Sequence, residues 1–78
     1  MSNSTKYFDH HCSTSKEDIV ENITEYHNKA FCVVFYDEVC KDRNEAINII
    51  ETFKKSKNQF HSVKYWQNNQ LYWLTKIF

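Results

Sequence analysis

The chain of 78 residues contains no glycine and no proline, residues that make up about 7% and 5% of an average protein. Glycine-rich loops, which bring the backbone close to a phosphate group, are therefore excluded. Any backbone position with positive φ must be occupied by another residue, and Asn tolerates such a position well. Tight turns are therefore expected at asparagines.

Carboxylates are absent from the last third of the chain. Residues 1–51 carry ten acidic and five basic side chains, a net charge of −5, whereas residues 52–78 carry five lysines and no acid, a net charge of +5. The formal net charge of zero hides this dipole. The basic third also holds seven of the thirteen aromatic residues. Such asymmetry favours an interaction surface over a catalytic one.

Long apolar segments and paired cysteines are also missing. The apolar run 30–36 is far too short to span a bilayer, and no N-terminal stretch has the pattern of a signal peptide. Three cysteines cannot form a full disulfide framework. We therefore expect a reduced, cytoplasmic protein with no membrane segment. Cys32, inside the apolar run, is predicted to be a small core residue.

No pattern of catalytic or metal-binding residues is complete. His10-His11-Cys12 is the most metal-like string, but adjacent residues seldom bind one ion and structural zinc sites need spaced pairs. Cys40 precedes a predicted helix, where a thiol can be acidified. A thioredoxin-type redox loop would need a second cysteine in the same loop as Cys40 and a cis-proline, and both are missing. The sequence predicts no metal, no cofactor and no enzymatic activity.

Two segments have the apolar period of a helix. The first helix is predicted over residues 15–29, with Thr14 and Glu17 in the spacing of a capping box. The second is predicted over residues 43–57. Asp42 and Glu45 form its capping box.

Three further segments have the patterns of strands. Residues 31–36 are apolar on both faces, as in a strand covered on two sides, and residues 37–41 are predicted to form a loop. Asn68-Asn69 can form the type I′ turn of a C-terminal hairpin. That turn sets the cross-strand pairs, which are Gln67 with Gln70, Trp66 with Leu71, Tyr65 with Tyr72 and Lys64 with Trp73.

Together these patterns predict an α+β fold, a small single domain over residues 13–78 preceded by a flexible tail over residues 1–12. Tyr7 and Phe8 could instead dock or form a short edge strand. The element order is α-β-α-β-β. Two helices are expected on one face of a three-stranded mixed sheet that ends in the hairpin, with the last strand between two parallel strands. The other face would be open and would carry Trp66 and Trp73.

Two surfaces are candidates for binding. On the first helix, carboxylates recur every fourth residue and form an acidic face of Glu17, Glu21 and Glu25. In the C-terminal third, lysines interleave with tryptophans, as on platforms for single-stranded nucleic acid. The partner-binding residues predicted there are Lys54, Lys55, Lys57, Lys64, Trp66, Trp73 and Lys76. The same residues have ordinary structural roles as well: cations complement a helix C-terminus, and aromatics fill a small core.

Composition suggests the biological setting. Lysine outnumbers arginine nine to one, and Asn and Ile are abundant, which indicates an AT-rich gene. In size and composition the chain resembles small phage-encoded host-takeover proteins, including anti-CRISPR proteins, which share no common motif. This resemblance implies a non-enzymatic protein that inhibits or modulates a host protein complex. The alternative is a module that binds RNA or single-stranded DNA. Homodimerisation through the open, tryptophan-bearing face is also predicted.

Overall fold

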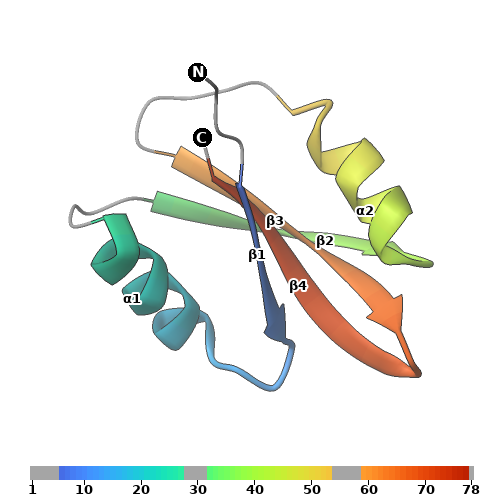
Figure 1. The fold of residues 1–78 in the computed structure, drawn as a ribbon, viewed down its shortest axis with the longest axis horizontal. Helices are drawn as coiled ribbons and strands as arrows, with labels where there is room; N and C mark the ends of the chain where they lie inside the picture. Colours follow the sequence, from blue (N-terminus) through green and yellow to red (C-terminus); the bar gives the residue numbers. More distant parts are fainter. Residues whose placement is uncertain (1–5, 28–31, 54–58, 78) are drawn as a thin grey trace.

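The computed structural model describes residues 6–27, 32–53 and 59–77. It confirms the α+β class and the order α-β-α-β-β, and adds one strand before the first helix (Figure 1). The elements are β1 (Lys6–His11), α1 (Lys16–His27), β2 (Cys32–Cys40), α2 (Arg43–Ile50), β3 (Gln59–Gln67) and β4 (Gln70–Ile77).

The sheet has four strands in the order β1-β4-β3-β2. Strands β2 and β3 are parallel, as predicted, but they are direct neighbours, so the expectation of β4 between them is wrong. Strand β4 instead pairs antiparallel with β3 and with β1. Residues 6–11 therefore form the edge strand that was the alternative to a flexible tail. Tyr7 and Phe8 explain the pairing, because they pack into the cores on opposite faces of the sheet.

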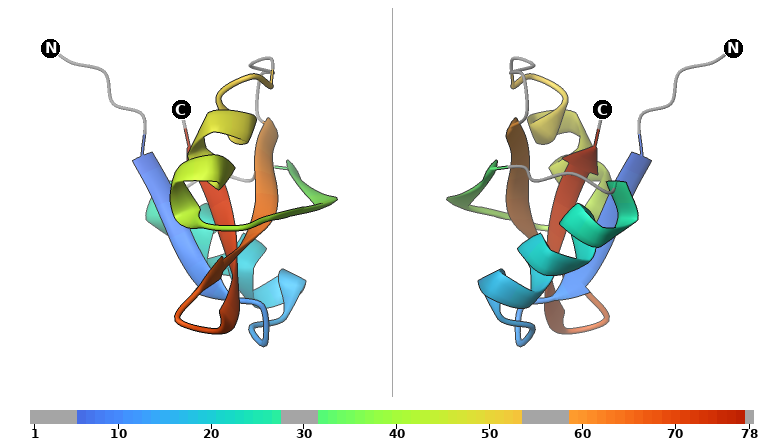
Figure 2. Two further views of the ribbon diagram at one scale, coloured as in Figure 1. Left: turned by 90° about the vertical axis from the view of Figure 1, so that its right-hand side faces the viewer. Right: turned by 90° about the vertical axis from the view of Figure 1, so that its left-hand side faces the viewer.

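The two helices lie on opposite faces of the sheet, and the prediction that both cover one face is wrong (Figures 1 and 2). Helix α2 packs against the face that carries Val63, Tyr65 and Leu74. Helix α1 covers Phe60, Trp73 and Ile77 on the other face. The hairpin is apolar on both sides, so burying each face under its own helix stabilises the folded chain.

The hairpin forms as the sequence predicts. Asn68 and Asn69 have φ values of 53° and 65°, which are the two left-handed positions of a type I′ turn. All four predicted cross-strand pairs are present in the register of β3 and β4. Because the turn fixes the register, it also decides which residues of β4 face each helix.

Side chains cap both helices, although one cap differs from the prediction. The amide of Asp18 donates to Ser15 Oγ at 3.1 Å, so Ser15 caps α1, and the expected pair of Thr14 and Glu17 does not. In α2, the amide of Glu45 donates to Asp42 Oδ1 at 2.9 Å, which confirms Asp42 as the N-cap. The helix ends at Ile50, so the predicted continuation through residues 51–53 is wrong, and residues 54–57 lie outside the described residues.

Strand β2 runs further than predicted. It continues to Cys40, where a loop was expected, and its register against β3 shifts between Phe35 and Val39. The extension places Cys40 in the core under α2, whereas Cys32 is exposed at the start of the strand, contrary to the prediction. Alternation does not separate the two cysteines, because both lie on the side of the sheet opposite Val33 and Phe35. Their position along the strand does: Cys40 packs with Ala46 and Ile50, whereas Cys32 is the first residue of the strand.

The turn geometry leads to a test of stability. Replacing Asn69 by Val should lower the free energy of unfolding by about 1 kcal/mol, because β-branched residues resist positive φ. Asn69→Gly should leave it unchanged or raise it by a few tenths of a kcal/mol. Urea denaturation measures both values. The control is Gln67→Val, an exposed strand position beside the turn, and an equal loss in this variant and in Asn69→Val would contradict the assignment.

Candidate functional site

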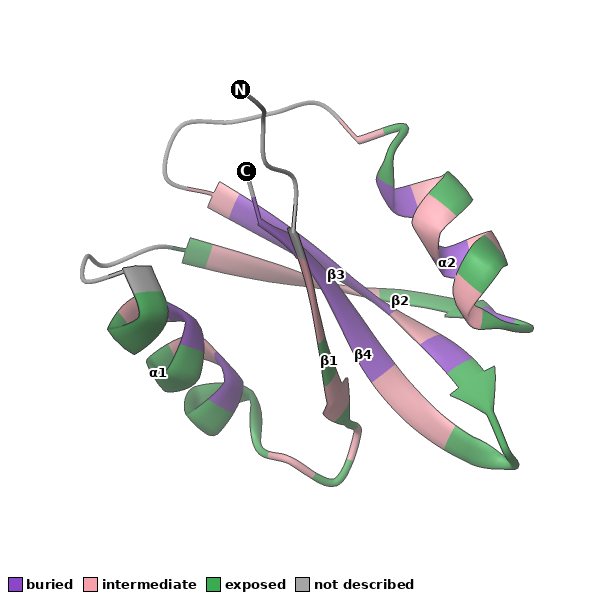
Figure 3. Cartoon of the chain, in the orientation of Figure 1, coloured by how far each residue is buried: buried purple, intermediate pink, exposed green. Residues whose placement is uncertain are grey.

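Helix α1 presents its predicted acidic face to solvent. Glu17, Glu21 and Glu25 are all exposed, and the outer side of α1 is coloured as exposed in Figure 3. Beside two of them lies an open groove of about 530 Å³, lined by Lys16, Glu17, Val20 and Glu21. This set, called the α1 groove below, combines two carboxylates with the apolar side chain of Val20. Glu25 belongs to the same acidic face but does not line the groove.

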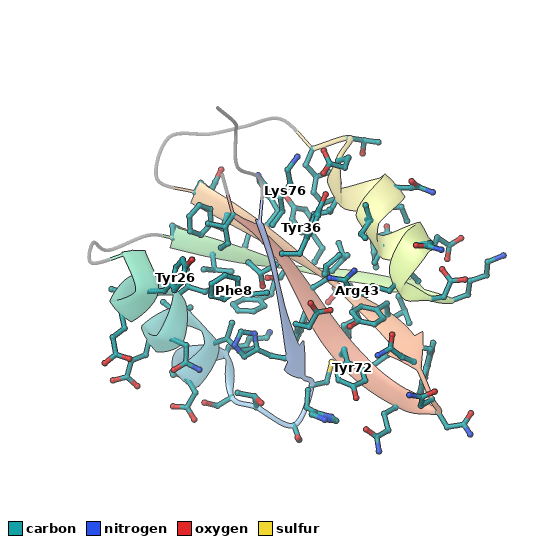
Figure 4. The ribbon with its side chains drawn as sticks, viewed as in Figure 1. Phe8, Tyr26, Tyr36, Arg43, Tyr72 and Lys76 are labelled. Atoms are coloured by element: carbon teal, nitrogen blue, oxygen red, sulfur yellow. The ribbon has the colours of Figure 1, made fainter. Side chains whose placement is uncertain are left out.

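Lys16, one of the residues that line the α1 groove, marks the flank of α1 that faces β2. The Nζ atom of Lys16 is 5.3 Å from the ring centroid of Phe35 on β2 and 5.8 Å from that of Trp73. The opposite flank of α1 faces β1, where the rings of Tyr26 and Phe8 meet edge to face with centroids 5.0 Å apart (Figure 4). The core residues of α1 lie between these two flanks.

The basic and aromatic C-terminal third does not form the predicted stacking platform. Trp73 is only 5% exposed, packed under α1 and against Phe35. Lys76 is also 5% exposed, and its Nζ atom lies 2.7 Å from Glu51 Oε1. Neither residue can contact a nucleic acid from these positions, which corrects their assignment. Lys54, Lys55 and Lys57 lie outside the described residues.

Trp66 and Lys64 remain at the surface with a neighbour that the sequence did not indicate. Trp66 and Val39 are 47% and 50% exposed, and Val39 pairs with the half-buried Lys64. Alternation along β3 puts Phe60, Lys64 and Trp66 on the face that α1 covers, and α1 packs on Phe60 but leaves Trp66 exposed. The set Val39, Lys64 and Trp66 is called the Trp66 patch below.

A network of polar side chains attaches β1 to α2. Arg43 of α2 donates two hydrogen bonds to the carboxylate of Asp9, at 2.8 and 3.0 Å (Figure 4). The Tyr65 hydroxyl donates to the same carboxylate. Nearer the start of β1, Glu51 accepts from the Tyr7 hydroxyl and from Lys76. The two carboxylates therefore join the edge strand, the helix and the two central strands.

The pKa shifts in this network favour a structural role over proton transfer at neutral pH. Burial raises the pKa of Tyr7 to about 12, with help from the hydrogen bond to Glu51. Burial and the bond to Asp9 likewise raise the pKa of Tyr65. Burial alone would raise the pKa of Asp9, but the hydrogen bonds from Arg43 and Tyr65 outweigh it and hold that pKa below its usual value. A base near neutrality would need the opposite shift.

The remaining candidates for chemistry are held apart or buried. His10 and His11 are neighbours on β1 and point to opposite faces, and in the described residues no three His, Cys, Asp or Glu side chains gather as a metal site. Burial, then the charges of Glu45, Glu38 and Asp42, raise the pKa of the Cys40 thiol, which is the reverse of the acidified thiol considered above. His61 is buried and shares a 2.9 Å hydrogen bond with the Tyr36 hydroxyl.

Comparisons with known protein families, curated proteins and solved structures found no match. In the described part of the chain, no helix is both long enough and apolar enough to cross a membrane. The site therefore has to be interpreted from its own geometry. Sequence reasoning identified Glu17, Glu21 and Trp66, but it missed Val39, because that residue lies in a polar stretch that was assigned to a loop.

The Asp9–Arg43 pair makes stability depend on pH. The pKa of Asp9 is lower in the folded chain than in the unfolded one, where it is about 3.9. Its contribution is therefore present above about pH 4 to 5 and is lost as the pH falls through the folded pKa. Asp9→Asn should cost about 1 kcal/mol near pH 7, a modest value because both partners are partly exposed. This cost should vanish towards about pH 2.

Urea denaturation across this pH range measures the difference between the wild type and Asp9→Asn. Asp37→Asn, which removes an exposed carboxylate of β2 outside the network, is the control. A cost of Asp9→Asn that stays constant from about pH 7 to about pH 2 would contradict the role assigned to the ionised carboxylate.

Proposed function

We propose that this chain is a small non-enzymatic binding protein that engages another protein through the α1 groove and the Trp66 patch. The observation that carries the proposal is the incomplete cover of one sheet face: α1 shields Phe60, Trp73 and Ile77, while Val39 and Trp66 stay about half exposed. Tryptophan is enriched among the residues that dominate protein–protein affinity. Glu17 and Glu21 line a groove on the helix that covers this same sheet face, and they would add polar contacts to an interface there.

The geometry of the Trp66 patch suits an anchor for a partner side chain. Val39 and Lys64 lie on adjacent strands, about 5 Å apart, and Trp66 follows Lys64 by two residues, about 7 Å along the strand. The three side chains thus share one small area of the sheet. The Lys64 Nζ atom lies 5.4 Å from the Trp73 ring centroid. This contact directs its charge towards α1 and leaves the indole of Trp66 as the main exposed apolar group.

Nucleic-acid binding is the weaker alternative. Of the predicted platform, only Lys64 and Trp66 are accessible among the described residues, because Trp73 and Lys76 are buried. The exposed carboxylates Glu17 and Glu21, on the helix that covers this face, would repel a phosphate backbone. An origin in a phage or mobile element, and an inhibitory effect on a host complex, rest on composition and remain part of the proposal. Homodimerisation through this face is part of the same proposal, and it would now involve Trp66 and not Trp73.

The Trp66 patch can be tested by substitution. The immobilised chain should retain a specific protein from a bacterial lysate, and Trp66→Ala should weaken that complex by about 30-fold, which corresponds to about 2 kcal/mol at an interface anchor. Mass spectrometry identifies the retained protein, and titration with the purified partner gives the dissociation constants. Because Trp66 is exposed, this change should leave the free energy of unfolding nearly unchanged.

Gln67→Ala is the matched control, since Gln67 is the next residue, is also exposed and points to the other face. Equal affinity for Trp66→Ala and the wild type would exclude the patch as the anchor. A gel shift with mixed-sequence oligonucleotides at low salt tests the alternative, and a shift abolished by Trp66→Ala would favour nucleic-acid binding instead.

A further inference from the structure

Two lysines on the face that α1 covers direct their charges at one aromatic ring. The Nζ atom of Lys16, in the first turn of α1, lies 5.8 Å from the centroid of the Trp73 ring. The Nζ atom of Lys64, on β3, lies 5.4 Å from the same centroid. Each contact attracts a cation to the face of an indole, but the two ammonium groups repel each other. Lys16 and Lys64 are called the lysine pair below.

No carboxylate offsets this repulsion in the part of the chain that the structure describes. All ten acidic side chains belong to described residues, and neither member of the lysine pair forms an ion pair with any of them. Arg43 and Lys76, by contrast, each bind a carboxylate, at 2.8 and 2.7 Å. The lysine pair therefore concentrates positive charge that the chain does not neutralise with an acidic side chain of its own.

The sequence explains why neither lysine is paired, because the residues best placed to pair with them are apolar. These are Ile19 and Val20, three and four positions after Lys16 on α1, and Val39 and Trp73, the cross-strand neighbours of Lys64. Lys16 also lines the α1 groove with Glu17 and Glu21. Its ammonium group, however, approaches the ring of Phe35 on β2 to 5.3 Å, so its charge is directed at the sheet.

An exposed apolar surface adjoins the lysine pair. Trp66 follows Lys64 by two residues on the same face of β3, about 7 Å along the strand, and is 47% exposed. Its cross-strand neighbour on β4 is the half-buried Leu71. Two residues of an extended chain span the same distance of about 7 Å. One short segment of a partner can therefore contact both an ammonium group and the indole of Trp66.

The charge and this spacing define what the segment must carry. A carboxylate accepts hydrogen bonds at both oxygens, so one Asp or Glu side chain can bind either or both ammonium groups. Its negative charge also offsets the repulsion between them. An apolar side chain two positions from the acidic residue then lies on the same side of the extended segment, at the distance that separates Lys64 from Trp66.

We propose that the lysine pair binds an Asp or Glu side chain of a partner protein, and that an apolar residue two positions away in the same extended segment packs on Trp66. This inference rests on the proposed protein-binding function and names the chemistry of the partner. Nucleic acid fits less well, because Glu17 and Glu21, exposed on α1, would repel the phosphates that flank the bound one. A second copy that offered its α1 carboxylates would place the acidic faces of two helices side by side.

A synthetic peptide tests the inference with the intact chain. The probe is a peptide with blocked ends and the sequence Glu-Ser-Leu-Ser-Glu, added at millimolar concentrations to the isotope-labelled chain at low salt. NMR chemical shifts of the Trp66 indole N–H and the Lys64 amide measure its binding. We expect both signals to shift with one dissociation constant, which rises with added NaCl. The peptide Gln-Ser-Leu-Ser-Gln, of the same size and without charge, should bind at least about threefold more weakly.

Substitutions test the lysine pair itself. Lys16→Gln combined with Lys64→Gln should weaken binding of the glutamate peptide roughly three- to tenfold, the range expected for two partly exposed ion pairs. Lys16→Arg combined with Lys64→Arg keeps both charges and should change the dissociation constant less than about twofold. Lys41→Gln is the matched control for lost charge, because Lys41 is exposed beside the start of α2. It should also change binding less than about twofold.

Folding is measured beside binding, since Lys64 is half-buried. Urea denaturation of each variant separates a lost contact with the peptide from a lost fold. Lys16 is exposed, so Lys16→Gln alone carries the test if the double variant is unstable. It should weaken binding of the glutamate peptide roughly two- to threefold.

The outcomes separate this inference from the proposed function. Failure of the glutamate peptide to bind, or equal binding of the glutamine peptide, would overturn the role of the carboxylate. Equal losses for Lys41→Gln and the double glutamine variant would overturn the assignment to the lysine pair. A mixed-sequence oligonucleotide that displaces the peptide would assign the surface to phosphate, and concentration-dependent shifts of Trp66 in the free chain would assign it to a second copy. In each case a protein whose capture depends on Trp66 would leave the proposed function standing.

Discussion

The rest of the structure depends on a hairpin that is apolar on both faces. Strands β3 and β4 bury Val63, Tyr65 and Leu74 on one side and Phe60, Trp73 and Ile77 on the other. A chain of 78 residues has few side chains with which to cover two faces. Each face is covered by one helix, and on the α1 side this cover leaves Val39 and Trp66 exposed. The exposed surfaces of the protein follow from this constraint.

The two faces of the sheet differ in the contacts that attach the covering helix. On the α2 side, the ion pairs Asp9–Arg43 and Glu51–Lys76 connect the strands to the α2 segment. Strand β1 forms one edge of the sheet there. On the α1 side, Val39 and Trp66 stay exposed beyond the cover, and the groove is lined by residues of α1 itself. The polar network therefore serves the fold, while the surface available for recognition lies on the opposite face.

The most accurate predictions came from short local patterns in the sequence. The turn at Asn68-Asn69 predicted the register of the hairpin residue by residue, because only a few backbone geometries join two strands in two residues. The cap at Asp42 was predicted for a similar reason. The acidic face of α1 was also predicted, since helical spacing alone places Glu17 and Glu21 together. By contrast, β1 was predicted only as the alternative to a flexible tail, and the second half of β2 was missed, because edge strands with polar residues have little periodicity.

Thus the sequence by itself determined the α+β class, the two helix starts, the hairpin register and the opposite charges of the two parts of the chain. The tertiary structure decided which helix covers which face, that β2 lies at an edge beside α1, and that Trp73 and Lys76 are buried while Trp66 is exposed. The physical reason is that alternation assigns a residue to a face, but only the packing of distant segments decides whether that face is covered at that position.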